Sequence, residues 1–334
     1  MGCIFGLGVS MGKIIKIWIC IQIILNCTSC LSSAEELSAS TTILLYHEIT
    51  NESANDFNNF SVTVDSFVKQ MQYISENCNV ISLEEYVKCL KTNKKKNGKS
   101  VVVTFDDGYL SNYLYAFPIL KAFGIPATIF ITTGNIDTKN HLSWEQVNEM
   151  VESGSVDFGS HCKTHGRLTD FTHEEQYNEL KQSKEIIEHY TNKMCKYIAY
   201  PYGSANNEVI EIAKSVGYEA GVVVDDKVGI IDNSFALERY MVSGTDSVET
   251  LSSVIFPPLI GDIYEDHVIN SKDAVRLAQY LAKWDVNLTY YEQKAADFCS
   301  DGIVDSRDAV KLAQYLAKWD FENMITDSQN EKNN

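Results

Sequence analysis

Basic residues are scarce in this sequence, which has 28 lysines and arginines against 45 aspartates and glutamates and a net charge of −17. No acidic residue precedes residue 35, so the chain is more acidic still without its first 34 residues. This charge argues against a nucleic-acid partner, because a negative surface repels a phosphate backbone. The short basic run Lys94–Lys96 is interpreted as a solvated loop.

Long hydrophobic runs are also missing. The apolar stretch Ile17–Leu25 is shorter than the roughly 20 residues that span a bilayer. It follows Lys13 and Lys16 and precedes the small residues Ser32-Ser33-Ala34, which is the order of an export signal. We therefore predict a signal peptide over residues 1–34, a secreted protein and no transmembrane anchor in the mature chain.

Cysteines are few beyond this leader and show no pairing pattern. Four of the nine precede residue 35, and one of these, Cys27 or Cys30, could carry a lipid anchor. We prefer secretion, because the residues before each fit a lipobox poorly. The other five are odd in number and scattered, so no disulfide framework is predicted.

An internal repeat occupies the end of the chain. Residues 269–285 recur 35 residues later as residues 304–320, with 13 of the 17 positions identical. In each copy, alanines and leucines fall at helical spacing after a carboxylate-rich loop. We expect a small all-α domain over residues 261–320, a linker over 256–260 and a tail over 321–334.

Residues 41–255 alternate between strand-like and helix-like stretches. The expected strands are Thr42–Tyr46, Val101–Phe105, Ala127–Ile131, Val156–Gly159, Tyr197–Tyr200 and Gly221–Val224. The expected helices are Ser66–Asn77, Leu83–Leu90, Tyr113–Phe123, Ser143–Glu152, His173–Tyr190 and Asn207–Val216. This alternation predicts an α/β fold with a parallel sheet. In a (β/α) barrel, the polar residues that follow the strands would meet at the carboxyl-terminal face.

Two groups of polar residues follow expected strands. Asp106 and Asp107 come directly after a buried strand, and His161 and His165 lie four residues apart after a later one. One aspartate with two histidines leaves coordination positions open, as in a catalytic rather than a structural metal site. A second carboxylate beside the metal can act as a general base. These residues predict a metal-dependent hydrolase.

Three motifs give residues 41–255 a resemblance to the polysaccharide deacetylases, the NodB-like family 4 carbohydrate esterases. They occur in the family's order and are Thr104-Phe105-Asp106-Asp107-Gly108, Ser160-His161-Cys162-Lys163-Thr164-His165 and Tyr200-Pro201-Tyr202-Gly203. The resemblance implies a distorted (β/α) barrel and one catalytic divalent metal, with zinc preferred over cobalt or nickel. It also implies that the enzyme removes acetyl groups from polysaccharides.

The resemblance assigns roles to single residues. It implies that Asp107, His161 and His165 hold the metal, which polarises the acetyl carbonyl and acidifies a bound water. Asp106 would accept the proton of that water as it attacks. The backbone N–H of Tyr202 would help to hold the oxyanion.

Two residues that the family normally carries are missing. Ala199 stands where an arginine usually orients the base, and no histidine between His189 and His267 supplies the usual leaving-group acid. The same pattern marks the subgroup that includes poly-N-acetylglucosamine deacetylases. We expect His47 to supply the imidazole and Arg239 the guanidinium. A structural histidine and a surface ion pair are the alternatives.

The repeats resemble a type I dockerin, the module that attaches enzymes to a cellulosome scaffold, with two EF-hand-like calcium loops. The resemblance implies two sets of ligands, Asp262, Asp266, Val268, Asn270 and Asp273 in the first loop and Asp297, Asp301, Ile303, Asp305 and Asp308 in the second. It also implies recognition of a cohesin domain of a scaffoldin through Ser271, Lys272, Ser306 and Arg307.

The loops depart from the calcium-binding pattern. The third position is Tyr264 or Cys299 rather than Asn or Asp, and the sixth is His267 in the first loop but Gly302 in the second. Because the sixth position lies in a sharp turn that favours glycine, we expect the second loop to bind calcium more tightly.

Together these patterns predict a secreted, metal-dependent polysaccharide deacetylase docked to a cellulosome scaffold. Acetylxylan and N-acetylglucosamine polymers both remain open as substrates. A non-catalytic carbohydrate-binding subunit on a decayed esterase fold is the alternative, although the intact metal and base residues argue against it. A calcium-controlled adhesion protein is a third possibility that the enzyme motifs make unnecessary.

Overall fold

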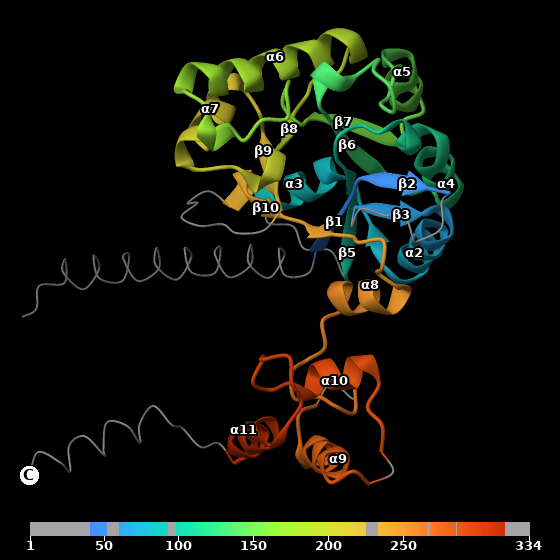
Figure 1. The fold of residues 1–334 in the computed structure, drawn as a ribbon, viewed down its shortest axis with the longest axis vertical. Helices are drawn as coiled ribbons and strands as arrows, with labels where there is room; N and C mark the ends of the chain where they lie inside the picture. Colours follow the sequence, from blue (N-terminus) through green and yellow to red (C-terminus); the bar gives the residue numbers. More distant parts are fainter. Residues whose placement is uncertain are drawn as a thin grey trace, which may run out of the picture. The chain divides into compact units, whose positions relative to one another are not determined.

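The computed structural model describes residues 41–51, 60–92, 98–224, 233–265, 268–284 and 286–317 (Figure 1). The chain divides into two compact units, the first ending at Ile255 and the second starting at Phe256. The predicted signal peptide, the basic run Lys94–Lys96 and the predicted tail lie outside the described residues. Within these ranges, no helix combines the length and the apolarity that crossing a bilayer requires.

A sheet of parallel strands forms the centre of the first unit. Its strands are β1 (Thr41–Tyr46), β4 (Asn79–Val80), β5 (Ser100–Phe105), β6 (Ala127–Ile131), β7 (Val156–Ser160), β8 (Tyr197–Ala199), β9 (Ala220–Val223), β10 (Leu237–Glu238) and β11 (Tyr240–Met241). Their order is β10-β9-β8-β7-β6-β5-β1-β11, with β4 also paired to β5. A separate parallel pair joins β2 (Glu48–Thr50) to β3 (Ser61–Thr63).

A single residue joins the two ends of this sheet. β10 pairs with β9 and β11 pairs with β1, yet only Arg239 separates β10 from β11 along the chain. The Arg239 N–H donates to the carbonyl of Val223 at 3.2 Å, and the Val242 N–H donates to the carbonyl of Leu45 at 2.9 Å. The segment therefore bridges both edges and nearly closes the sheet, which confirms the predicted α/β barrel.

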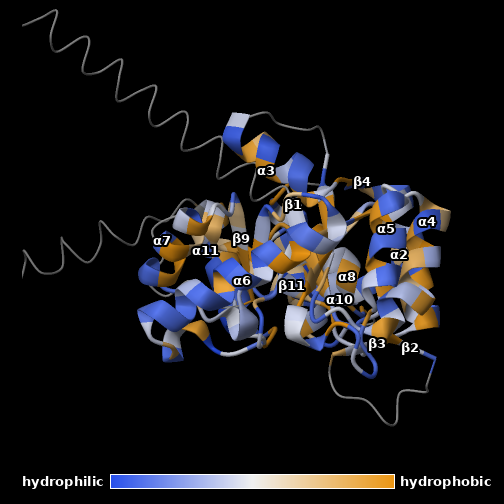
Figure 2. Cartoon of the chain, turned by 90° about the horizontal axis from the view of Figure 1, so that it is seen from above, coloured by the Kyte–Doolittle hydropathy of each residue, from blue (hydrophilic) through white to orange (hydrophobic). Residues whose placement is uncertain are grey.

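Helices surround the strands. They are α2 (Val64–Asn77), α3 (Leu83–Thr92), α4 (Phe117–Phe123), α5 (Trp144–Glu152), α6 (His173–Thr191), α7 (Asn207–Val216) and α8 (Val248–Ile255). Hydroxyl or amide side chains cap four of them, with Thr63, Ser143, Thr172 and Asn206 accepting from N–H groups of the first turn. Blue and orange bands alternate on α2, α4 and α6 in Figure 2, as expected for helices with one buried face.

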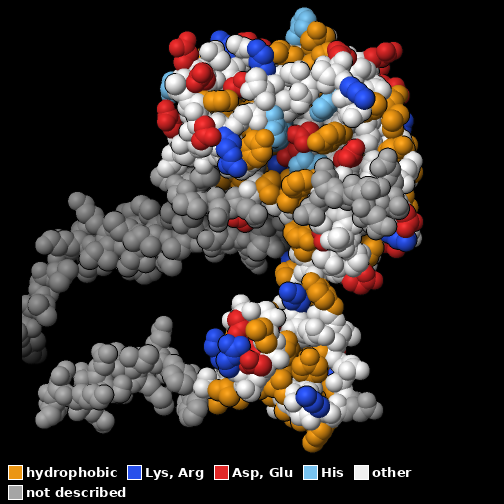
Figure 3. Space-filling view, viewed as in Figure 1, with side chains coloured by type: hydrophobic (Ala, Val, Ile, Leu, Met, Phe, Trp, Pro, Cys, Tyr) orange, Lys and Arg blue, Asp and Glu red, His pale blue; other side chains and the backbone are white. Residues whose placement is uncertain are grey.

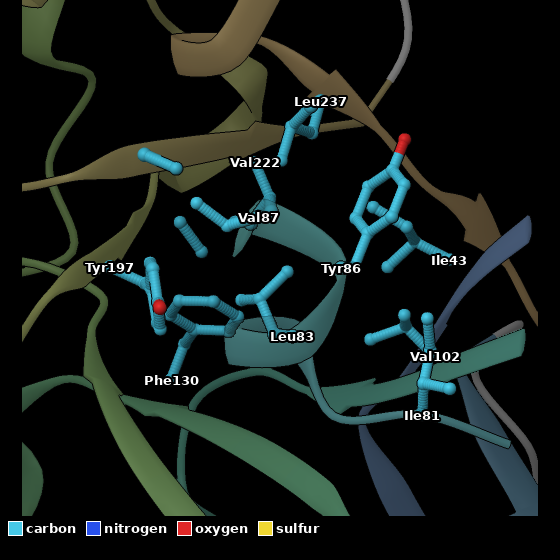
Figure 4. Close-up of a cluster of buried hydrophobic side chains, with 12 residues drawn as sticks. Ile43, Ile81, Leu83, Tyr86, Val87, Val102, Phe130, Tyr197, Val222 and Leu237 are labelled. Atoms are coloured by element: carbon cyan, nitrogen blue, oxygen red, sulfur yellow. The ribbon is translucent and has the colours of Figure 1, made fainter. Parts of the chain in front are cut away.

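Helix α3 fills the interior of the barrel at one end. Leu83, Tyr86 and Val87 pack among strand side chains that include Val102 of β5 and Phe130 of β6 (Figure 4). All five side chains are less than 5% exposed. Burial of large apolar side chains stabilises this end by about 1.5–3 kcal/mol for each, and the opposite end of the strands is left free for polar groups.

Most expected elements form where the sequence predicts them, and one expected helix is interrupted. The expected strands agree with the observed ones to within one residue at each end. The expected helix Tyr113–Phe123 divides into a π-helical turn, Asn112–Ala116, and α4. Pro118 lies in the first turn of α4, and it has no N–H to continue the helical hydrogen bonds of the preceding turn.

The second unit contains three helices in its described part. They are α9 (Ser271–Leu281), α10 (Tyr290–Ala296) and α11 (Ser306–Leu316), and α10 was not expected from the repeat. Leu277 and Leu312, which occupy equivalent positions in the two copies, are fully buried in a shared core with Ile263 and Leu288. The repeated helices therefore bury matching faces against each other.

Candidate active site

Polar side chains collect in a pocket of about 470 Å³ at the carboxyl-terminal ends of the strands. His47 follows β1, Asp106 and Asp107 follow β5, and His161 and His165 follow β7. Figure 3 shows histidine and acidic side chains gathered in a hollow on this face of the first unit. Residues that are distant in the sequence thus share one pocket because parallel strands end on the same side.

Three side chains can hold a metal ion. One ligand atom from each of Asp107, His161 and His165 lies within 4.8 Å of the other two. The nearest pair is Asp107 Oδ1 and His165 Nε2 at 3.2 Å, and His161 Nε2 lies 3.7 Å from the same oxygen. Among the described residues, no other histidine, cysteine or acidic side chains form such a cluster.

The tautomer of His161 makes this cluster electron-rich. Its Nδ1 lies 2.7 Å from the carbonyl oxygen of Ala199, which can only accept, so Nδ1 carries the proton. Nε2 therefore presents a lone pair toward the carboxylate oxygens of Asp106 and Asp107, at 3.8 and 3.7 Å. Burial lowers the pKa of His161, so the ring stays neutral near pH 7. An imidazole lone pair that faces a carboxylate oxygen across 3.7 Å fits a divalent cation of the zinc type.

Backbone conformation and helix α6 hold the ligand loop in place. Asp107 and His165 both have positive φ angles, 69° and 60°, which a side-chain-bearing residue rarely adopts. Glu179 of α6 accepts hydrogen bonds from the N–H groups of Lys163 and Thr164, both at 2.9 Å, and from the Thr164 hydroxyl. The loop between the two histidines is therefore fixed by the fold before any ion binds.

Asp106 forms a buried ion pair with Arg239. The guanidinium donates to both carboxylate oxygens, from Nη1 at 2.7 Å and from Nη2 at 2.6 Å, and Nη1 also reaches the Thr104 hydroxyl at 3.3 Å. Arg239 is 5% exposed, so the alternative of a surface ion pair is wrong. Burial alone would raise the pKa of Asp106, but Arg239 and then His161 outweigh it and lower the pKa to about 2.

His47 lies in the same pocket with one ring nitrogen unsatisfied. Its buried Nδ1 has no hydrogen-bond partner among the described residues, and its ring lies 5.3 Å from that of Phe60. Burial lowers the pKa of His47, while Asp106 and Asp107 oppose that shift. An imidazole without a structural hydrogen bond at Nδ1 fits a group that exchanges protons better than one that only supports the fold.

Tyr202 stands at the mouth of the pocket. Its ring is 58% exposed and packs edge-on against the His165 ring at a centroid distance of 4.8 Å. Its φ angle is 58°, which is uncommon outside glycine. Such backbone strain concentrates at functional sites, where a particular direction of an N–H or side chain is required.

Several residues that line or support the pocket were not predicted as site residues. Phe60, Tyr109 and Arg167 line it, and Glu179 and Thr104 support its ligands from behind. Burial, followed by the carboxylate of Asp107, raises the pKa of Tyr109 to about 12. Of these residues, Thr104 lies within the first motif and Tyr109 directly follows it, so these two could have been suspected from their positions in the sequence.

In the second loop of the helical unit, several carboxylates lie close together, and two of them contact the guanidinium of Arg307. Asp297 accepts from the N–H groups of Asp301 and Gly302 at 3.0 and 2.8 Å. The guanidinium of Arg307 lies 2.8 Å from a carboxylate oxygen of Asp301 and 2.8 Å from one of Asp305. One positive group thus bridges two of the expected calcium ligands. Because their oxygens are close enough to share one cation, the oxygen-rich loop fits a calcium ion.

The last aspartate of each loop caps the helix that follows it. Asp273 and Asp308 are fully buried and accept from the N–H groups of Asn270 and Asp305, both at 2.8 Å. These pairs form capping boxes at the starts of α9 and α11. Asp266 and His267 lie outside the described residues, so the first loop is described only in part.

The residues expected to meet a partner lie at the starts of the repeated helices. Ser271 and Lys272 begin α9, and Ser306 and Arg307 begin α11. All four are exposed. The two pairs occupy equivalent positions, and the guanidinium of Arg307 bridges two loop carboxylates.

Comparison with protein families gives two matches. The family model for polysaccharide deacetylases matches residues 93–221, and the model for type I dockerin domains matches residues 260–317. The first match includes Asp106 and the cluster of Asp107, His161 and His165, and the second spans the first repeat and all but the last three residues of the second.

Comparison with individual proteins agrees with these matches. A Bacillus subtilis protein described as a polysaccharide deacetylase, YxkH, is 33% identical over 210 residues, 62% of this chain and 73% of the relative. A poly-beta-1,6-N-acetyl-D-glucosamine N-deacetylase of Staphylococcus epidermidis is 34% identical over 216 residues, 59% of this chain and 73% of the relative. The solved structure of the Streptococcus pyogenes deacetylase PplD with acetate is similar with a TM-score of 0.60 and 29% identity, over 65% of this chain and 98% of that one.

Proposed function

This chain belongs to the polysaccharide deacetylase family and carries a type I dockerin domain, and from that premise we propose its metal, its substrate and its partner. It is a hydrolase that acts on acetyl groups. We propose that it is secreted, that it uses a divalent ion held by Asp107, His161 and His165, with zinc preferred, and that its dockerin binds calcium and a cohesin domain of a scaffoldin.

The catalytic proposal rests on one observation. The adjacent carboxylates of Asp106 and Asp107 face different partners. Arg239 donates to both oxygens of Asp106, whereas Oδ1 of Asp107 lies 3.7 Å from Nε2 of His161 and 3.2 Å from Nε2 of His165. Adjacent residues therefore have different roles, with Asp107 as a ligand and Asp106 as the base. A carbohydrate-binding subunit would not require this arrangement, so we prefer an enzyme.

Each residue of the pocket then has a defined task. A bound divalent ion supplies Lewis acidity, which polarises an acetyl carbonyl and acidifies water. Asp106 accepts the proton of the attacking water, and Arg239 holds its carboxylate in one orientation. The backbone N–H of Tyr202 donates to the oxyanion, and His47 gives a proton to the leaving group.

We propose that the bond cleaved is the acetamide of an N-acetylglucosamine polymer. One relative with a named substrate is the N-deacetylase of Staphylococcus epidermidis, and the pattern of Ala199 and His47 resembles that of the poly-N-acetylglucosamine deacetylases. Acetylxylan is the second candidate, because a dockerin would place the enzyme among proteins that act on plant cell walls.

Acetate release tests the reaction and the substrate together. Acetylated xylan, peptidoglycan and N-acetylglucosamine oligomers are compared side by side, with wild type and Asp106→Asn. The variant should lose roughly a hundredfold or more in rate while its metal content stays near that of wild type. If metal is lost in step with activity, the two aspartates have the opposite roles. If no substrate releases acetate, the enzyme proposal is wrong.

A further inference from the structure

We infer that Arg167 forms an anion-binding subsite at the mouth of the pocket, and that it selects polysaccharides bearing a carboxylate beside the acetylated sugar. This inference rests on the proposed function and goes beyond it, because the three metal ligands and Asp106 act on the acetyl group alone. Arg167 lines the pocket two residues after the ligand His165.

Ring contacts fix the position of this cation. The His165 ring packs edge-on against Tyr202 at 4.8 Å, and the guanidinium carbon of Arg167 lies 4.8 Å from the centroid of the same tyrosine ring. A guanidinium over an aromatic face is held by cation–π attraction while its N–H groups stay available at the edge. The Tyr202 ring thus holds the Arg167 guanidinium beside the proposed metal ligands. The gap between them is about the size of one sugar ring, so Arg167 could reach the sugar next to the acetylated one.

The Arg167 guanidinium forms no ion pair within the described residues. Within the described residues, no hydrogen bond or ion pair joins its side chain to another group, although the side chain is exposed. The other guanidinium near the pocket, that of Arg239, is buried and occupied by Asp106. Within the described residues, Arg167 thus keeps a guanidinium without an ionic partner at the pocket of a chain whose net charge is −17.

A carboxylate is the group that a planar guanidinium recognises with two parallel hydrogen bonds. Two kinds of acetylated polysaccharide carry one close to the acetyl group, those with uronic acid substituents and those with a lactyl ether on the sugar ring. Glu48, which also lines the pocket, is hydrogen-bonded to the Ser61 hydroxyl at 2.9 Å, so it is already partnered within the fold.

The test uses substrates that differ only in the carboxylate. Acetylated glucuronoxylan oligosaccharides and peptidoglycan glycan strands are each compared with their carboxyl-reduced forms, using the full-length protein. Wild type, Arg167→Gln and Arg167→Lys are assayed. The control variant is Lys181→Gln, which removes a cation that lies over the Tyr177 ring on α6 outside the pocket.

The expected result is a change in preference. For one of the two acidic substrates, Arg167→Gln should lower the ratio of kcat/KM for the acidic form to that for the reduced form by about five- to tenfold, mainly through KM. Arg167→Lys should fall in between, and Lys181→Gln should match wild type. Calorimetric binding of the acidic oligosaccharide should weaken in the same order and should weaken with added salt.

The ratio separates this inference from the proposed function. A damaged pocket would lower both values and leave their ratio unchanged. Acetate release with equal ratios in wild type and Arg167→Gln, for both acidic substrates, would overturn the anion subsite and leave the deacetylase standing. Absence of acetate from every substrate would overturn both.

Discussion

Two of the candidate metal sites of this chain, the barrel cluster and the second calcium loop, differ in what holds their ligands. In the barrel, His161 is 3% exposed, and its ring is fixed by the Ala199 carbonyl between strands that close around it. In the second loop of the helical unit, Asp301 and Asp305 are partly or wholly exposed and are bridged by the flexible side chain of Arg307. The barrel can therefore hold its ligands without an ion, whereas the loop depends on a cation to keep like charges together.

The comparison leads to opposite expectations for metal removal. Loss of the barrel ion should abolish the chemistry and leave the fold, because apolar burial around α3 stabilises the barrel. Loss of calcium should unfold the helical unit, because its core is small and its loops carry many carboxylates.

The largest effect is expected at His161. His161→Ala leaves two ligands, which is too few for a stable site, so both the bound metal and acetate release should be lost. Far-ultraviolet circular dichroism should remain that of a folded barrel. The control is His173→Ala, because His173 is an exposed side chain that pairs with Glu208 away from the pocket. Full activity after exhaustive chelation would overturn the metal mechanism.

A large loss of stability is expected at Arg239. Arg239→Gln leaves the buried Asp106 carboxylate without its guanidinium, which should lower the free energy of unfolding by about 3–5 kcal/mol. Denaturant unfolding with a chelator present measures this without a contribution from metal. Lys214→Gln, which removes an exposed ion pair with Glu211, should change stability by less than about 1 kcal/mol. Equal effects of the two variants would contradict the importance of the buried pair.

The same pair gives a pH dependence with a definite sign. The pKa of Asp106 is lowered to about 2 in the folded protein, below its value of about 3.9 in unfolded chains. Its ion pair therefore stabilises the fold above about pH 4, and this stabilisation is lost as the pH falls toward 2. Asp106→Asn should lack this part of the acid destabilisation. If the free energies of unfolding of wild type and Asp106→Asn fall in parallel between pH 4 and pH 2, the ion pair is not the source of this acid destabilisation.

An intermediate effect is expected from calcium. Residues 256–334 should gain helical signal when calcium is added to a chelated sample, because the ion binds the native loops only. The second loop, with Gly302, should fill at lower calcium than the first. Asp297→Asn and Asp262→Asn report on the two loops separately. Equal helicity with and without chelator, or a tighter first loop, would overturn this account, and failure to bind any cohesin would remove only the scaffold partner.

The smallest effect is expected at Arg307. Its guanidinium bridges Asp301 and Asp305, so it competes with calcium for their oxygens. Arg307→Gln should raise the calcium affinity of the second loop by about two- to fivefold, the scale of an exposed ion pair. Lys272→Gln is the matched variant at the same position of the first repeat. A lower affinity in Arg307→Gln would mean that the arginine supports the loop rather than competes for it.

The sequence predicted the regular elements of the barrel well because each is long enough to show a pattern. Strands such as β5 are continuous apolar runs, and α7 begins and ends where expected. β10 and β11 were missed because strands of two residues have no periodicity. Their existence depends on pairing with β9 and β1, which local sequence does not encode.

The candidate site was predictable only where its residues belong to motifs. The spacing of His161 and His165 identifies a possible ligand pair from the sequence alone. Arg239 was suggested because Ala199 stands where the family normally has an arginine. Nothing in the sequence around Arg239 indicated that this residue joins two edges of the sheet. Glu179 was not foreseen because it reaches the ligand loop from a helix that begins after that loop. Long-range packing determines such supporting residues.

The closure of the barrel through Arg239 has a consequence for the order of biosynthesis. A ribosome completes Asp106, Asp107, His161 and His165 well before residue 239, so a nascent chain acquires all the proposed metal ligands of the barrel while the barrel is still open. Until the last two strands emerge, Asp106 has no guanidinium and one edge of β1 has no neighbour. A truncated product ending near residue 224 would contain the three proposed ligands and still lack the guanidinium that holds Asp106.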